Sequence, residues 1–264
     1  MTLTRSTARA LRRLSAPLVE LVFPATCWAT GAAIAAAEGG LSTGVREQIA
    51  RGILWPYCTL CGSTTGKFAD HSKANPCPRC AVRNLGVRTI ARVGTYELPL
   101  SALVRQLKFH HHPEVARIVA PFLYQAITLR GGPIDTLIPV PLHWQRKISR
   151  GYNQSEELAR SLAAISDWPM ADVLRRIKRT SEQSHGLSVP QRIENLRGAF
   201  ACRPTAALGG KHVWLIDDVC TTGATLHAAA MAFRGLPRPQ RPASINAAVL
   251  CVTDWTQVPK EEPA

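Results

Sequence analysis

One stretch of the chain decides the fold, and it reads Val213-Trp214-Leu215-Ile216-Asp217-Asp218-Val219-Cys220-Thr221-Thr222-Gly223-Ala224-Thr225. Its first four residues are apolar and include β-branched side chains, which predicts a strand buried on both faces of a parallel sheet. Asp217 and Asp218 are expected to close this strand, and a short loop then leads into a helix from Leu226. Such a strand–loop–helix unit points backbone N–H groups and the positive end of a helix dipole at one place. The stretch therefore predicts an anion site at the carboxyl edge of a sheet.

The side chains of this loop favour one kind of anion. Thr221, Thr222 and Thr225 add hydroxyl donors, and the glycine at 223 lets the backbone approach a phosphate closely. Two carboxylates beside a phosphate would repel it unless they face sugar hydroxyls or a divalent cation. Donors on one side and acceptors on the other suit a ribose 5-phosphate. The alternative is an Asp pair that merely caps a helix in an ordinary α/β protein.

Composition limits what the chain can be. Its 264 residues are enough for one α/β domain with a smaller appendage, and a hydrophobic fraction of 46% is ample for a core. The net charge is +14, from 32 basic and 18 acidic residues. This excess indicates an anionic partner, either nucleic acid or phosphorylated small molecules, and charge alone does not separate the two. A genome that favours arginine would also raise the basic count.

The first residues resemble a signal peptide only superficially. Four arginines precede an apolar run over residues 18–37, but Glu20, Pro24 and Gly31 interrupt that run. The run is too broken to span a bilayer. We therefore expect a basic amphipathic helix over residues 2–22, no stable membrane insertion and a cytoplasmic protein. The alternative is a signal or anchor segment.

Four of the eight cysteines have the spacing of a metal site. Cys58 and Cys61 form one C-x-x-C pair, and Cys77 and Cys80 form a second pair after fifteen intervening residues. Two such knuckles supply four thiolates for a tetrahedral Zn²⁺, which leaves no open coordination position for catalysis. The alternative is a pair of redox C-x-x-C motifs.

Periodicity and breaker residues predict further elements. We expect strands over residues 88–96, 135–141, 173–177 and Ser244–Val252, and helices over residues 99–109, 113–129 and Gln154–Ile165. Asn153 is expected to cap the last of these helices. The polar, basic residues 178–197 are expected to form a mobile lid over the site.

Basic side chains gather after the strand over residues 135–141, at the same edge as the aspartates. They are His143, Arg146, Lys147 and Arg150. Such a group suits a second phosphate, and the alternative is a solvated basic rim. Lys108, near the end of an expected helix, is a further candidate for phosphate contact.

Together these segments resemble the competence protein F (ComF) family, which is associated with DNA uptake and carries a type I phosphoribosyltransferase-like domain. The matching parts run in the family's order over residues 55–252. They are the two C-x-x-C pairs, Leu107-Lys108-Phe109, Ile138-Pro139-Val140-Pro141, Arg150-Gly151-Tyr152-Asn153-Gln154-Ser155, the segment from Gln183 to Phe200, and the stretch quoted above. That stretch resembles the 5-phosphoribosyl 1-pyrophosphate (PRPP) signature of type I phosphoribosyltransferases. One departure is Thr30, which replaces the second cysteine of a further knuckle begun by Cys27, so we expect no metal there.

The resemblance implies an α/β fold: a type I phosphoribosyltransferase-like core, with a parallel five-stranded sheet flanked by helices, and a small N-terminal zinc-ribbon domain. It implies PRPP and Mg²⁺ as ligands, with Asp217 and Asp218 as the candidate catalytic pair that holds the ribose hydroxyls. The 5-phosphate would bind what we call the phosphate loop, Cys220, Thr221, Thr222, Gly223, Ala224 and Thr225. The pyrophosphate turn and the flexible loop would supply Val140, Pro141, Leu142, Arg146, Arg150, Lys108, Arg179, Gln183 and Arg192.

Two hypotheses about function remain open. In the first, the chain is a phosphoribosyltransferase, linked to DNA uptake, that transfers a phosphoribosyl group to an acceptor. In the second, it is a non-catalytic factor that binds single-stranded DNA through basic residues of the ribbon and the N-terminal helix, with PRPP as a regulatory ligand. A helicase of the uptake machinery is a candidate partner by the same resemblance. The expected domains are an irregular segment (1–54), the zinc ribbon (55–87), the phosphoribosyltransferase-like domain (88–255) and a loose tail (256–264).

Overall fold

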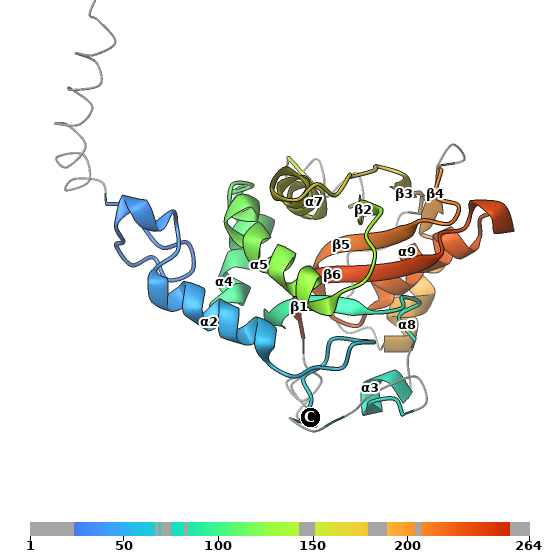
Figure 1. Cartoon of the computed structure of the whole chain (residues 1–264), viewed down its shortest axis with the longest axis horizontal. Coiled ribbons are helices and arrows are strands. Elements are labelled where there is room, and N and C mark those ends of the chain that lie inside the picture. Colours follow the sequence, from blue (N-terminus) through green and yellow to red (C-terminus); the bar gives the residue numbers. More distant parts are fainter. Residues whose placement is uncertain are drawn as a thin grey trace, which may run out of the picture.

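The computed structural model describes residues 24–66, 69, 75–81, 84–142, 151–178, 189–203 and 207–253. Their centre is a sheet of four parallel strands in the order β1 (Ile90–Thr95), β6 (Ser244–Val252), β5 (His212–Cys220) and β2 (Thr136–Pro139) (Figure 1). The helix expected over residues 2–22 and the tail over residues 256–264 lie outside the described residues.

Strand β5 lies between β6 and β2, and its side chains alternate between the two faces of the sheet. Trp214 and Ile216 pack into the core on one face, and Val213 and Leu215 pack into the core on the other. All four are at most 1% exposed. The prediction of a strand buried on both faces is confirmed.

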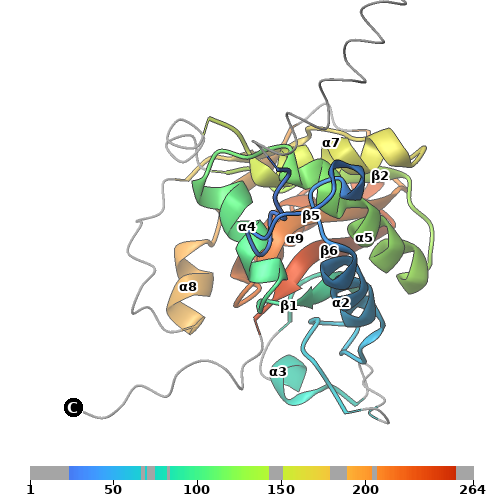
Figure 2. The ribbon, with the colours of Figure 1, turned by 90° about the vertical axis from the view of Figure 1, so that its left-hand side faces the viewer.

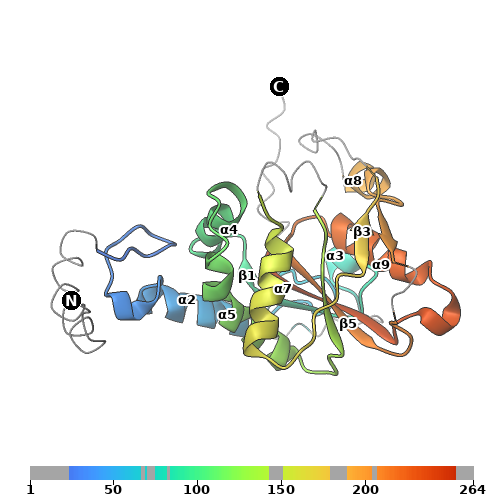
Figure 3. The same cartoon turned by 90° about the horizontal axis from the view of Figure 1, so that it is seen from above.

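Each face of the sheet is covered by different elements (Figures 2 and 3). On the face of Trp214 lie α2 (Thr43–Leu54), α4 (Leu100–Phe109), α5 (Val115–Arg130) and α7 (Gln154–Ile165). On the face of Leu215 lie α9 (Ala224–Arg234), β3 (Leu174–Arg176), β4 (Phe200–Cys202) and the cysteine ribbon with α3 (Pro78–Ala81). Helix α8 (Val189–Asn195) contacts α9, and two short 3-10 helices span Ala36–Glu38 and Arg238–Gln240. The phosphate loop and the ribbon therefore share one side of the molecule.

The expected fifth strand does not join this sheet, so the parallel sheet of the described residues has four strands rather than five. Strand β3 instead pairs antiparallel with β4 in a separate two-stranded sheet. At the open edge of β2, an isolated bridge joins Leu137 to Met170. The Leu137 N–H donates to the carbonyl of Pro169 at 2.8 Å. Because Pro169 has no N–H of its own, the ladder cannot continue through it.

A second difference concerns the aspartates, which do not close β5. The strand continues to Cys220 because Val219 and Cys220 pair with Cys251 and Val252 of β6. The aspartates consequently sit on a paired strand, which holds their backbone in place.

No helix within the described ranges is long and apolar enough to cross a membrane.

Candidate functional site

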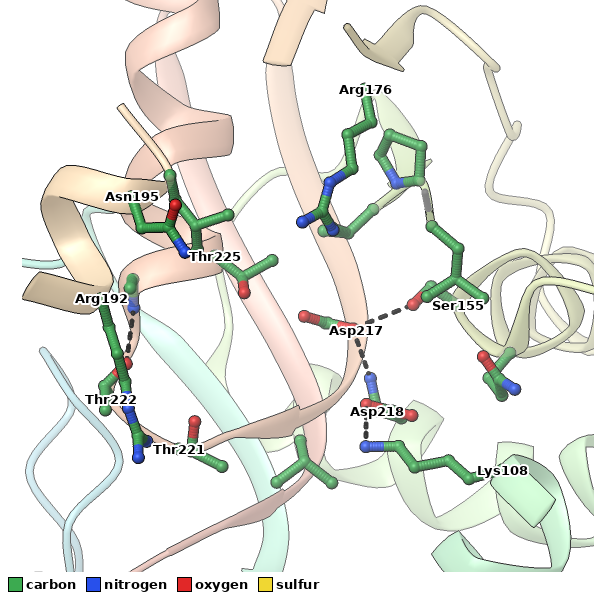
Figure 4. A pocket seen from close by; sticks show the side chains of 17 residues that line it. Lys108, Ser155, Arg176, Arg192, Asn195, Asp217, Asp218, Thr221, Thr222 and Thr225 are labelled. Carbon is green, nitrogen blue, oxygen red and sulfur yellow. Dashed lines mark hydrogen bonds and ion pairs between the residues drawn. The ribbon is translucent and has the colours of Figure 1, made fainter. Parts of the chain in front are cut away.

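The pocket that contains both aspartates lies at the carboxyl ends of β2 and β5 (Figure 4). Its walls come from the end of α4, the start of α7, the phosphate loop, and residues of β3 and α8. Ligands of open parallel sheets bind at this edge, because the loops that follow neighbouring strands converge there.

Two donors fix the carboxyl group of Asp217. The Ser155 hydroxyl, in the first turn of α7, donates to Asp217 Oδ1 at 2.9 Å. The backbone N–H of Asp218 donates to the same oxygen at 2.9 Å. Figure 4 shows both bonds. The carboxyl group is therefore oriented before any ligand arrives.

The charge of Asp217 is sensitive to pH in the neutral range. Burial and the adjacent carboxylate of Asp218 raise the pKa of Asp217 to about 7. Lys108, the Ser155 hydroxyl and the Asp218 N–H act in the opposite direction. Each of these three stabilises the charged carboxylate, whereas burial favours the neutral acid.

Lys108 contacts Asp218 inside the pocket. Its Nζ lies 3.1 Å from Asp218 Oδ1, and the two side chains are 22% and 10% exposed. Water and salt screen such a partly buried pair less than an exposed one. The sequence predicted a phosphate contact for Lys108, whereas in the structure its ammonium group pairs with a carboxylate. This cation reduces the repulsion that Asp218 would exert on an approaching anion.

The end of α4 is held in position by side chains at the start of α7. Tyr152 Oη and Gln154 Nε2 both donate to the carbonyl of Leu107, Gln154 at 3.1 Å. Leu107 directly precedes Lys108, so these bonds fix the backbone from which the lysine extends. The side chain of Asn153 caps α7 by accepting from the Ser155 N–H at 3.2 Å, and its amide donates to the Val140 carbonyl at 3.1 Å. Residues 152–155 thus link the ends of α4, β2 and β5 around the pocket.

The phosphate loop has a backbone conformation at its centre that residues other than glycine rarely adopt. Gly223 has φ of +76°, and a Cβ added there would lie 2.0 Å from Leu85 Cδ2. Thr222 Oγ1 accepts from the Ala224 N–H at 3.3 Å, where α9 begins. The N-terminal end of α9 thus borders the pocket, since Ala224 and Thr225 line it. The loop can offer backbone N–H groups, hydroxyls and a helix dipole to an anion.

The opposite wall contains residues that the sequence did not identify. Arg176 points from β3 toward the middle of the pocket, and its guanidinium carbon lies 5.6 Å from the centre of the Phe200 ring (Figure 4). Asn195 lines the wall from α8, and Ser155 was likewise not predicted as a site residue. The strand of Arg176 was predicted, and two-residue alternation could have separated it from the exposed Arg175. Asn195 belongs to the segment from Gln183 to Phe200 that carries the family resemblance, but it was not predicted as a site residue.

Most of the predicted site residues come together in this one pocket. It contains Lys108, Val140, Pro141, Leu142, Arg192, Asp217, Asp218, Thr221, Thr222, Ala224 and Thr225. Cys220 and Gly223 complete the loop, and Cys220 is buried. Arg146, Arg150, Arg179 and Gln183 lie outside the described residues.

The four cysteines with metal spacing form a compact cluster, which we call the cysteine cluster. The sulfurs of Cys58 and Cys80 are 3.8 Å apart, and those of Cys61 and Cys77 are 3.5 Å apart. All four ligand atoms lie within 4.8 Å of one another. Tetrahedral Zn²⁺ with Zn–S bonds of ~2.3 Å requires sulfurs ~3.8 Å apart. The cluster therefore fits a structural zinc ion, and its four thiolates would leave no position for a substrate.

Comparison with known proteins assigns the family. The model of the phosphoribosyl transferase domain family matches residues 106–264. Competence protein F of Haemophilus influenzae is 33% identical over 207 residues, which cover 76% of this chain and 86% of that protein. The chain belongs to the ComF family. The family expected from the sequence motifs is confirmed.

Two further relatives also match about two thirds or more of this ComF-family chain. The DNA utilization protein YhgH of Salmonella typhi is 32% identical over 217 residues, which cover 78% of this chain and 89% of that protein. The competence protein ComFC of Bacillus subtilis is 28% identical over 177 residues, which cover 66% and 69%. The matched domain, residues 106–264, includes strands β2, β5 and β6 of the sheet and all the residues that line the pocket.

Proposed function

We propose that this ComF-family chain binds PRPP together with Mg²⁺ in the pocket at the end of β5. The observation that carries the proposal is the position of Asp217 and Asp218 directly before the loop that opens α9. Carboxylate oxygens accept from the two hydroxyls of a ribose, and the loop donates to its 5-phosphate. A phosphorylated ribose uses both halves of this arrangement, whereas a simple anion uses only one.

Three basic side chains around the pocket support a ligand with a second phosphorylated group. Lys108, Arg176 and Arg192 line the same pocket as the aspartates. Planar guanidinium groups suit phosphate oxygens, because they can donate two parallel hydrogen bonds. Mg²⁺ would be held largely through the phosphates of PRPP and would neutralise part of their charge.

The same residues suit transfer of the phosphoribosyl group to an acceptor. The bond from C1 of the ribose to pyrophosphate breaks, C1 acquires oxocarbenium character, and the acceptor atom forms the new bond and loses a proton. Arg176 and Arg192 would stabilise the charge that develops on the departing pyrophosphate. Incubation with PRPP, Mg²⁺ and a panel of nucleobases, scored for pyrophosphate release, tests this step and identifies the acceptor.

Calorimetry on an aspartate double variant tests the binding proposal. Asp217→Ala with Asp218→Ala should weaken PRPP binding by about 2–4 kcal/mol, because two charged hydrogen-bond acceptors are lost. A pocket that bound any anion would bind PRPP equally well or better after losing two negative charges. Undiminished affinity would therefore disprove ribose recognition.

A matched control separates this effect from net charge. Asp167→Ala with Glu47→Ala removes the same number of charges from exposed positions outside the pocket. Its PRPP affinity should equal that of the unmodified chain.

Single-stranded DNA is a second candidate partner, and one surface favours it. Trp55 is 61% exposed at the end of α2 and lines a groove together with Tyr57 and Arg130. The guanidinium carbons of Arg92 and Arg130 lie 4.8 and 5.6 Å from the centre of the Tyr57 ring. Aromatic faces beside cations bind single strands without sequence preference, and the net charge of +14 would add attraction.

A further inference from the structure

Arg79 connects the cysteine cluster to the phosphate loop. It lies between Cys77 and Cys80 in the sequence, within α3, yet its side chain extends away into the phosphoribosyl transferase domain and is 4% exposed. Its Nη2 donates to the carbonyl of Thr221 in the phosphate loop. Its Nη1 donates to the Thr253 carbonyl at 3.3 Å and to Ser63 Oγ at 3.1 Å.

These bonds join two strand ends at the point where the phosphate loop begins. Thr221 directly follows β5, and Thr253 directly follows β6. The Thr253 N–H also donates to the Cys220 carbonyl at 3.2 Å. Because a trans peptide is planar, a carbonyl of Thr221 that faces Arg79 directs the N–H of Thr222 away from the ribbon. One buried guanidinium thus sets the orientation of a donor in the loop.

The segment that follows the second knuckle contacts the loop as well. Leu85 is buried, and its Cδ2 would lie 2.0 Å from a Cβ added at Gly223, so a side chain at that position would require Leu85 to move. His227 Nδ1, in the first turns of α9, donates to the Asn84 carbonyl at 2.7 Å. The loop therefore touches the ribbon at its start, its centre and its exit into α9.

The first knuckle is fixed on a different strand. The carbonyl of Thr59 accepts from the Ile90 N–H at 2.8 Å and from Thr89 Oγ1 at 3.0 Å, at the start of β1. The two knuckles are thus anchored at separate places, one on β1 and one on the phosphate loop. The bond from Arg79 to Ser63 already links the two knuckles, and a metal bound by all four sulfurs would join these anchors into one rigid unit.

We propose that Arg79 is a positioning residue that makes the order of the phosphate loop depend on metal in the cysteine cluster. The sulfur spacing fits Zn²⁺, and Zn²⁺ held by Cys77 and Cys80 fixes the turn that carries Arg79. This gives the zinc ribbon a role in ligand binding at a distance, and it rests on the proposed function of the loop as a phosphate site.

Hydrogen–deuterium exchange on the full zinc-loaded chain tests the coupling without any ligand. Arg79→Gln leaves all four cysteines intact, so elemental analysis should still find one zinc per chain. Peptides covering residues 217–227 should exchange faster in this variant than in the unmodified chain. Zinc removal by a chelator should produce the same local change, and added zinc should reverse it.

Arg92→Gln is the matched control, because Arg92 is equally buried and donates to Thr64 of the ribbon. In Arg92→Gln, the hydrogen–deuterium exchange of residues 217–227 should not increase more than that of the rest of the chain. Unchanged exchange of these residues in zinc-loaded Arg79→Gln would overturn the proposal, and so would a uniform increase equal to that of Arg92→Gln. If the chain unfolds when zinc is removed, the exchange rates of zinc-loaded Arg79→Gln still test the proposal.

Calorimetry with PRPP and Mg²⁺ then measures the consequence for binding. Arg79→Gln with zinc bound should bind PRPP roughly tenfold more weakly, as expected for lost hydrogen bonds from a charged donor. Unchanged affinity would mean that the loop does not need Arg79. If the unmodified chain binds no PRPP, the proposed function fails, and the exchange experiment alone decides the coupling.

Discussion

At the residue scale, the protonation state of Asp217 depends on the groups that surround it in the pocket. Burial and the carboxylate of Asp218 favour the protonated form, and Lys108, Ser155 and a backbone N–H favour the charged form. The result is a pKa of about 7 for Asp217, so its charge is set by small changes around it. A ligand that binds beside Asp217 and Asp218 changes the surroundings of Asp217 and therefore its pKa.

Binding of PRPP should consequently become stronger as the pH rises from about 6 to 8, since the charged Asp217 is the better acceptor for a ribose hydroxyl. Calorimetry in buffers of different ionisation enthalpy should show release of protons on binding near pH 7. Asp217→Asn should remove this part of the pH dependence, which separates it from titration of PRPP itself. An equal slope in both proteins would exclude Asp217 as its source.

The same pKa has a consequence for stability. The pKa of Asp217 is above its ordinary value of 3.8, so the folded chain holds this proton more tightly than the unfolded chain. The contribution of this proton to the free energy of unfolding is therefore complete below pH 3.8 and is lost as the pH rises through about 7.

Lys108 should be needed to keep the two aspartates compatible with a phosphorylated ligand. Lys108→Met removes the ammonium group 3.1 Å from Asp218 and raises the negative potential of the pocket. We expect PRPP to bind about tenfold more weakly or worse, and proton release on binding to move to higher pH. Arg105→Met, on the exposed side of α4, removes the same charge as a control and should bind PRPP normally. Equal affinity in the two variants would rule out a specific role for Lys108.

At this scale, strand and loop rules predicted site residues that are neighbours in the chain. The family resemblance added distant ones such as Lys108 and Arg192, but Ser155 was missed. Asp217, Asp218 and the loop threonines fall within one stretch, so strand and loop rules place them together. Ser155 lies 62 positions away from Asp217, and only the packing of α7 against β5 brings it within 2.9 Å. No spacing rule connects two such positions.

At the scale of elements, prediction worked where periodicity and a breaker agreed. Helix α7 has the predicted bounds, Gln154–Ile165, because Asn153 caps it and its apolar positions recur on one face. Strand β6 also has its predicted bounds. Strand β3 was predicted as a strand, but the sequence does not state its partner. Its antiparallel pairing with β4 depends on the distant Phe200–Cys202, and that pairing removed the fifth strand from the sheet.

Removal of one cysteine should show that the ribbon depends on its metal. Cys58→Ser leaves three thiolates, so zinc should fall below one per chain and the free energy of unfolding should drop by several kcal/mol. Elemental analysis and urea unfolding measure the two effects. Cys27→Ser, also at a buried cysteine, is the control and should keep the full metal content. Full zinc occupancy in Cys58→Ser would exclude the four-cysteine site.

At the scale of the whole molecule, two candidate ligand surfaces are separate. The pocket at the end of β5 and the groove beside Trp55 share no lining residue. The ribbon borders both, since Tyr57 and Thr59 line the groove and Arg79 reaches the phosphate loop. A phosphorylated sugar and a single strand of DNA could thus bind at the same time, with the ribbon between them.

If the groove binds single-stranded DNA, affinity should fall steeply with salt and depend little on sequence. The logarithm of the binding constant should fall with the logarithm of salt concentration, with a slope of about −0.7 per phosphate neutralised. Trp55→Ala should cost about 1–3 kcal/mol, as expected for one stacked base, and should leave the salt slope unchanged because no cation is removed. Arg130→Gln should reduce the slope instead, since it removes a cation beside the groove.

Leu98→Ala, at an exposed apolar residue outside the groove, is the control and should bind normally. Fluorescence titration of labelled single strands at several salt concentrations measures all three variants, and absence of binding at low salt would exclude DNA as a direct partner. Binding that is unchanged in the Asp217→Ala/Asp218→Ala variant but weakened in Trp55→Ala would place the DNA in the groove rather than in the pocket.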